Sequence, residues 1–513
     1  MANSPASQPM LLENPLDGRA TFPLSGEIVI EILRHASPFD VLSMRKTCRF
    51  ICNVTRMRTV WINALERVCA RHGVFKPTFP LQRMSILDLE YASLGPRRFL
   101  KMLNSIQGDE SPLPYGNREL IFRRRPPLTG AYPCDGFYMA TGGRFLLVYG
   151  EDDSLSLWDL GYNLRAPMKT YPVATLERSG ELAAASQSFD GEGILLVTRQ
   201  PTTDFEMDNL AVYEVRPTSD GRDSTFVKLA QLGLDGSPTL HDVRITPRVV
   251  SIRCGPLFFV WDWRINKGCR WSSSTLFNSP ARAMTVLEGT ILAYDEGGTV
   301  YNWDIPALQH LPILDLAHFP SIENEPKACI RPLVQHPEIS VLIRCTASHR
   351  QNTEPALDPI LCILYDDDSW NGPPERRTPM SLYSVREMGR GNEDPFIPNT
   401  LLLPAGSCDH AFGDRSERFY GAMTSLYRCE DNLVFCADTN DLSVVVTVMP
   451  TPLRATLREL PPAMLSRKLL PSDALHGELT TGVQLGFCPV SGRLAYRATD
   501  ESFYLRDFIS APE

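Results

Sequence analysis

The feature that most limits the fold of this chain is a series of short apolar runs between residues 132 and 509. Runs such as FLLV, ILLV, FFVW and VVVTV show no alternation of polar and apolar residues, so each is expected to be a strand covered on both faces. They form seven candidate hairpins, at residues 143–160, 193–215, 248–263, 288–305, 339–368, 432–448 and 492–508. Seven such hairpins predict a seven-bladed β-propeller, because a closed ring of blades buries both faces of each sheet.

The chain before these strands has a helical texture. Ile28, Ile32 and Leu33 share one helix face. Ser37 is expected to cap the next helix, with Pro38 at its first position. The fold class is therefore α+β multidomain, an all-α module followed by an all-β propeller. The predicted divisions are a flexible N-terminus at 1–20, the helical module at 21–66, a helical extension and linker with room for one strand at 67–131, and the propeller at 132–509.

Composition describes an ordinary globular protein with 513 residues, 43% hydrophobic and 22% charged, too long for one hydrophobic core. The net charge of −9 argues against a nucleic-acid or anionic-membrane partner, since both need a surplus of Lys and Arg. We find no signal peptide and no apolar stretch long enough to span a membrane. Thirteen scattered cysteines fit reduced thiols, and we expect a cytoplasmic or nuclear protein.

The sequence has few motifs that would indicate an enzyme or a metal-binding protein. No Cys-x-x-Cys occurs, and Cys69-x-x-His72 has no second half-site. The Gly pairs at 142–143 and 297–298 lack a following Walker Lys, and no Gly-x-Ser-x-Gly elbow exists. The acidic runs 151–153 and 366–368 are better explained as solvated turns. We therefore predict no catalytic residue, no metal and no cofactor; a catalytic propeller remains a remote alternative.

Residues 22–65 resemble the F-box, particularly in mushroom-type fungal proteins. The family has roughly Leu-Pro-x-Glu-Ile, then Ile-Leu, then a Ser-Pro-x-Asp-Leu turn, a Cys-Arg segment and a later Trp. The matched positions, in order, are Leu24, Glu27, Ile28, Ile32, Leu33, Ser37, Pro38, Asp40, Leu42, Cys48, Arg49 and Trp61. Ser25 replaces the usual Pro, a mild change because Ser caps helices well.

The strand region resembles WD-repeat propellers through three Trp-Asp pairs. These are Trp158 with Asp159, Trp261 with Asp262, and Trp303 with Asp304. We expect them to be structural, with each Trp packed between sheets and its indole N–H satisfied locally. The Gly-His dipeptide of ordinary WD repeats is missing, which puts their internal hydrogen-bond network in doubt.

The F-box resemblance implies binding to a Skp-type adaptor and, through it, to cullin and RING subunits. The adaptor-binding candidates are Leu24, Glu27, Ile28, Ile32, Leu33, Pro38, Leu42, Cys48 and Trp61. Any apolar residue among them could instead fill the module's own core. The implied function is the substrate-recognition subunit of an SCF-type ubiquitin ligase, with the propeller holding an unidentified target near the charged enzyme. The alternative is an interaction scaffold that does not direct degradation.

Overall fold

The computed structural model separates the chain into two compact units, Met1–Ala64 and Leu65–Glu513. The residues it describes are 24–106, 111–121, 136–150, 154–201, 207–218, 224–235, 240, 242–273, 283–287, 289–294, 299–311, 321–324, 326–330, 339–345, 360–367, 378–387, 400–410, 419–423, 426–439, 444–450, 465–470, 485–499 and 502–511. The predicted flexible terminus, residues 1–20, lies outside this set.

Short capped helices build the N-terminal unit. They are α1 (Gly26–His35), α2 (Pro38–Arg45), α3 (Arg49–Val54) and the first residues of α4 (Arg58–His72). The Ser37 hydroxyl accepts from the Asp40 N–H at 3.2 Å and Pro38 opens α2, as predicted. The buried apolar side chains of α1 to α3 are Val29, Leu33, Val41, Ile51 and Val54.

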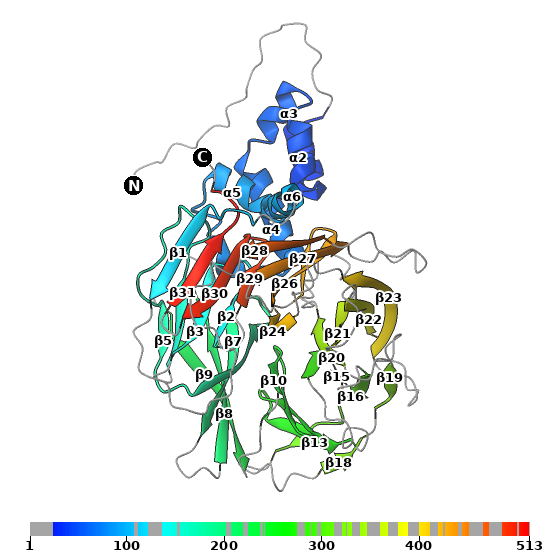
Figure 1. The fold of residues 1–513 in the computed structure, drawn as a ribbon. Coiled ribbons are helices and arrows are strands. Elements are labelled where there is room, and N and C mark those ends of the chain that lie inside the picture. Colours follow the sequence, from blue (N-terminus) through cyan, green and yellow to red (C-terminus); the bar gives the residue numbers. More distant parts are fainter. Residues whose placement is uncertain are drawn as a thin grey trace, which may run out of the picture. The chain divides into compact units, whose positions relative to one another are not determined.

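In the described residues the strand region forms seven sheets, all antiparallel except for one parallel strand pair in the third (Figure 1). The first has β2 (Phe137–Met139), β3 (Phe145–Tyr149), β4 (Leu155–Asp159) and β5 (Ala174–Leu176); the second has β6 (Glu181–Gln187), β7 (Ile194–Pro201), β8 (Met207–Val215) and β9 (Phe226–Asp235). The third has β10 (Asp242–Ile245), β11 (Val250–Cys254), β12 (Leu257–Asp262) and β13 (Lys267–Ser272), with β17 (Gln309–His310) and β18 (Ser321–Glu323). The fourth has β14 (Ala283–Leu287), β15 (Thr290–Tyr294), β16 (Val300–Asp304) and β19 (Ala328–Ile330).

The remaining sheets follow the same plan. The fifth has β20 (Ile339–Cys345), β21 (Ile360–Asp367), β22 (Thr378–Glu387) and β23 (Thr400–His410); the sixth has β24 (Phe419–Met423), β25 (Tyr427–Cys429), β26 (Asn432–Thr439), β27 (Val444–Pro450) and β28 (Leu465–Leu470). The seventh has β29 (Leu485–Cys488), β30 (Arg493–Thr499), β31 (Ser502–Asp507) and β1 (Gly116–Ile121). Each predicted hairpin is confirmed as a pair of neighbouring antiparallel strands.

Neighbouring sheets pack face to face as the blades of a β-propeller. One apolar cluster joins the first and second sheets, through side chains such as Leu157 and Leu196. Further clusters join the second to the third, the third to the fourth, and the sixth to the seventh. The packing of side chains is described for six sheets, whereas the fifth is described by its backbone pairing alone. The described packing gives six blades, not the predicted seven.

The first strand of the region closes the seventh sheet. β1 pairs antiparallel with β31, from Gly116 opposite Asp507 to Ile121 opposite Ser502. The sequence predicts a linker with room for one strand here and a propeller that begins only at 132, whereas the structure places this strand in the seventh sheet. The strand GNRELI has no apolar run, and its partner lies at the other end of the chain, so local sequence does not show where it pairs.

A helical cap, which we define as Leu65–Ile106, packs on the turns between the first two strands of several sheets. It holds the end of α4, η1 (Lys76–Thr78), α5 (Ile86–Ser93) and α6 (Gly95–Ser105). The N–H of Phe75 donates to Thr141 O at 2.9 Å, and that of Lys76 donates to Gly191 O at 3.0 Å. Phe99 of α6 lies in the apolar cluster of the sixth and seventh sheets. This helical part, predicted as a helical extension, is packed against the strand region.

His72 fastens the cap to the sixth sheet as a neutral, buried group. Its Nδ1 lies 2.9 Å from Arg428 O, so Nδ1 carries the proton and donates to that carbonyl. Its Nε2 is buried and has no hydrogen-bond partner among the described residues. Burial lowers the pKa of His72 from 6.5 to about 4; the contact with Arg428 O opposes this, and the nearby Arg71 charge adds to it.

We expect acid to loosen this contact. Between pH 6.5 and about 4 the unfolded chain binds a proton at His72 that the folded chain does not, so stability falls as the pH decreases through this window. The loss is roughly 3 kcal/mol when complete. Urea unfolding at pH 7 and pH 4.5 should show a smaller acid loss for His72→Gln than for the wild type. The exposed His35→Gln is the matched control, and an equal acid loss in all three proteins would refute the role of His72.

Candidate functional site

One face of α1, together with Leu24 just before its N-cap, exposes a row of large apolar side chains. Leu24, Ile28 and Ile32 follow one another at four-residue spacing, with exposed fractions of 36%, 50% and 46%. The Ser25 side chain accepts from the Ile28 N–H and so fixes the start of the helix. Val29 and Leu33 lie on the adjacent, buried face. Such a row has the character of a docking surface, because apolar groups left in water gain from burial against a partner.

The other predicted adaptor-binding residues divide by exposure. Glu27 and Cys48 are exposed, and the Cys48 Sγ caps α3 by accepting from the Ile51 N–H. Pro38 and Leu42 are half-buried.

Leu33 and Trp61 lie in the interior and do not reach the surface. The Trp61 indole N–H donates to Thr55 O at 2.8 Å, and the Arg45 guanidinium lies 5.4 Å from the ring centroid. Phe39 and Met57 are exposed to 43% and 45% and were not singled out from the sequence, where an isolated apolar residue gives no signal.

The predicted Trp-Asp residues are mostly internal. Trp261 and Trp303 are fully buried, as expected, whereas Trp158 is half-buried. The Trp261 indole N–H donates to Asn266 Oδ1 at 3.2 Å, which confirms local satisfaction there. The Trp303 N–H has no such partner in the described part of the chain, contrary to expectation. Its ring instead packs against Phe258, with centroids 5.1 Å apart.

The aspartates of these pairs bind basic side chains. The Arg144 guanidinium donates two hydrogen bonds, of 2.8 and 2.7 Å, to the Asp159 carboxylate. It also donates to Pro77 O in the cap. In the third sheet, Arg248 Nε lies 3.0 Å from Asp262 Oδ2. Asp304 pairs with Lys327.

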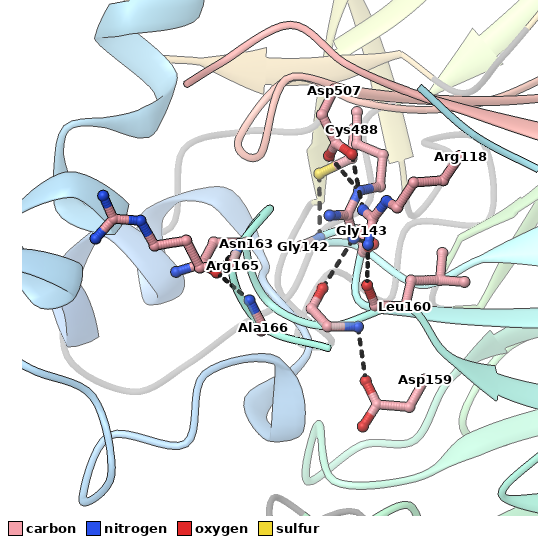
Figure 2. A network of polar contacts seen from close by, with 12 residues as sticks. Arg118, Gly142, Gly143, Asp159, Leu160, Asn163, Arg165, Ala166, Cys488 and Asp507 are labelled. Atoms are coloured by element: carbon pink, nitrogen blue, oxygen red, sulfur yellow. Dashed lines mark hydrogen bonds and ion pairs between the residues drawn. The ribbon is translucent and has the colours of Figure 1, made fainter. Parts of the chain in front are cut away.

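The same arrangement recurs without tryptophan in the seventh sheet (Figure 2). The Asp507 carboxylate accepts a hydrogen bond from Arg493 at Oδ1 and one from Arg118 of β1 at Oδ2, both at 2.7 Å. Arg493 also donates to the backbone carbonyls of Gly143 and Gly161, and Arg118 to that of Leu160. These bonds join the closing strand, the seventh sheet and the first sheet.

Ion pairing governs the charge of Asp507. Burial alone would raise the pKa of its carboxyl, but Arg493 and Arg118 more than offset this and hold the pKa below its ordinary value. The carboxylate is therefore ionised and bridges two arginines. Neither arginine is predicted from the sequence. For Arg493, as for Arg144 and Arg248 in other sheets, the signal is an Arg at the start of the second strand or up to two residues before it. It stands 14 or 15 residues before the Asp that ends the third strand.

This polar network has a structural role, since both oxygens of the Asp507 carboxylate are bound by arginines that also donate to backbone carbonyls. Among the described residues, no group of three or more His, Cys, Asp or Glu side chains comes together as a metal site. No helix in the described ranges is long and apolar enough to cross a membrane. The exposed row on α1 is thus the surface with the plainest capacity to bind a partner.

Comparisons with known proteins give distant likenesses in structure. No family model and no curated protein matches the chain. The WD40 domain of Toxoplasma gondii coronin is 9% identical, with a TM-score of 0.41 over 79% of this chain and 90% of that domain. The C-terminal WD40 domain of Sif2 is 11% identical, with a TM-score of 0.35 over 75% and 84%. Hsv2 of Kluyveromyces lactis is 9% identical, with a TM-score of 0.29 over 54% and 73%. The fold assignment therefore rests on the sheets and their packing.

Proposed function

We propose that this chain is the substrate-recognition subunit of an SCF-type ubiquitin ligase. In this proposal the N-terminal unit is an F-box that binds a Skp-type adaptor, which in turn binds cullin and a RING subunit. The propeller holds a target protein, and ubiquitin transfer follows from proximity, without a catalytic side chain in this chain. The proposal places the protein in the cytoplasm or nucleus.

The supporting observation is the exposed row Leu24, Ile28 and Ile32. A helical unit of this size gains by burying such side chains, and an adaptor surface that covers them would supply that burial. The order of the F-box-like motif in the sequence supports a Skp-type adaptor as the partner. For the propeller we propose WD-type blades that hold the target protein.

The row makes a specific prediction for adaptor binding. Ile28→Asp with Ile32→Asp should reduce binding to a purified Skp-type adaptor at least a hundredfold, because two charges would be buried in an apolar contact. Both side chains are half exposed, so the melting temperature should stay within a few degrees. Binding is measured by calorimetry on the full chain.

Two variants serve as controls. Arg34→Ala, on an exposed position of the same helix, should leave adaptor binding unchanged. Leu33→Asp should unfold the N-terminal unit, since Leu33 is only 1% exposed, and so it reports on folding and not on docking. Full adaptor binding by the folded double variant would exclude the row as the docking surface.

The two candidate functions, a ligase subunit and a non-degradative scaffold, differ in the proteins that should co-purify with the adaptor. Purification of the tagged chain from its own cells should bring down cullin together with the adaptor if the chain is a ligase subunit. Recovery of the adaptor without cullin, with no ubiquitin transfer in a reconstituted assay, would favour the scaffold.

A further inference from the structure

The turn between β6 and β7 carries the most exposed aromatic side chain among the residues that the structure describes. Phe189 has an exposed fraction of 82%. A single exposed aromatic residue is ordinary on a protein surface. Phe189 differs because the backbone that carries it is restrained by several independent contacts.

The first restraint lies within the turn. The Ser188 hydroxyl donates to Asp190 Oδ1 at 2.5 Å and accepts from the Gly193 N–H at 2.8 Å. The same Asp190 oxygen accepts from the Glu192 N–H at 3.0 Å. Two backbone bonds, between Ser188 and Gly193 and from Gly191 to Ser188, close the turn.

The second restraint comes from outside the turn. Arg216, just after β8, binds Asp190 Oδ2 at 2.8 Å and Glu214 Oε1 at 2.8 Å. The helical cap holds the other side, where the Lys76 N–H donates to Gly191 O. Burial works against ionisation of Asp190, but Ser188, the Glu192 N–H and Arg216 outweigh it and lower the pKa to about 2.

A rigid loop that presents an aromatic ring is well suited to binding, because little backbone entropy remains to be lost when a partner closes on it. Aromatic side chains are also the residues that most often dominate binding energy at protein interfaces. The charges around the ring indicate the partner's chemistry. Asp190, Glu192 and Glu214 outnumber the two basic residues at the turn, Arg216 and Lys76, whose side chain runs beside Gly191. The rim of the turn therefore keeps a net negative charge.

We propose that the Phe189 turn (Ser188–Gly193) is an anchor for a protein partner with an apolar pocket rimmed by Lys or Arg. Phe189 fills the pocket, and the acidic rim pairs with the basic edge. The proposal concerns a surface of the propeller unit and does not depend on the F-box assignment.

The test uses the full chain with a photo-cross-linking phenylalanine analogue at position 189, expressed in the organism's own cells. The same analogue at Val227, exposed to 53% on β9, is the control position. A protein cross-linked from 189 and not from 227 is then purified, and its affinity for the unmodified chain is measured by calorimetry. The cross-link identifies the candidate, and the affinities of the variants decide the proposal.

Phe189→Ala should weaken this affinity at least tenfold and leave the melting temperature unchanged. Ser188→Ala keeps the aromatic ring and every charge but loosens the turn, so it should weaken binding by a smaller factor. Raising the salt concentration should weaken binding further, as attraction between an acidic rim and a basic edge requires. The proposal is overturned if position 189 yields no protein beyond the control, if Phe189→Ala binds like the wild type, or if salt leaves the affinity unchanged.

Discussion

Replacement of Asp507 by Asn is expected to cost about 3–5 kcal/mol of folding stability, which is the usual effect of removing one partner from a buried ion pair. Arg493 has a side chain only 1% exposed and would lose its counter-charge. Arg118, whose side chain is 17% exposed, would lose its bond from the closing strand at the same time. Asn keeps the shape of the side chain, so the change isolates the charge.

The measurement is urea unfolding of the full chain at pH 7, followed by fluorescence and circular dichroism. Asp431→Asn is the matched control, because its carboxylate pairs with Arg71 while 87% exposed. Surface pairs of this kind contribute about 0–1 kcal/mol. A loss below about 1 kcal/mol for Asp507→Asn would mean that the two arginines are satisfied by backbone carbonyls and that the carboxylate does not hold the ring together.

Truncation of Trp261 to Ala should destabilise the propeller by a similar amount, about 3–5 kcal/mol. Trp261 is 1% exposed and belongs to the apolar cluster between the second and third sheets. The truncation would leave a cavity there and would also leave the Asn266 side chain without its donor. The melting temperature should fall by several degrees, while binding per folded molecule should be spared.

Phe189→Ala is the matched control for this loss, since it removes an aromatic ring that is 82% exposed and should change stability by no more than about 0.5 kcal/mol. The stability losses of the two variants therefore distinguish a buried aromatic side chain from an exposed one. Unchanged stability of Trp261→Ala would mean that the ring does not fill the interior between the blades.

Local sequence determined the strands and helices of this protein well. Runs such as FLLV and FFVW must be strands covered on both faces, because nothing in them can face water, and they form β3 and β12. Ser37 and Pro38 mark the start of α2, because capping depends on residues that are neighbours in the chain. The interior positions of Trp261 and Trp303 are also predicted correctly, because both stand in strands with apolar neighbours.

Sequence alone could not separate the docking residues from the core of the N-terminal unit. Ile32 and Leu33 are adjacent and equally apolar, yet one is 46% exposed and the other 1%. A short amphipathic helix carries apolar residues for both purposes, and which of them face inward depends on where the neighbouring helices pack.

Only the tertiary structure decided how the strand region is closed and locked. The strand GNRELI has no apolar pattern, and it belongs to the propeller because β31 lies beside it. Arg118 and Arg493 meet Asp507 from opposite ends of the sequence, and no spacing rule links Arg118 to that aspartate. Hydrophobic patterning is a property of neighbouring residues and is visible in one dimension. Ion pairs between distant segments depend on three-dimensional packing, so this protein's ring closure could be recognised only from the structure.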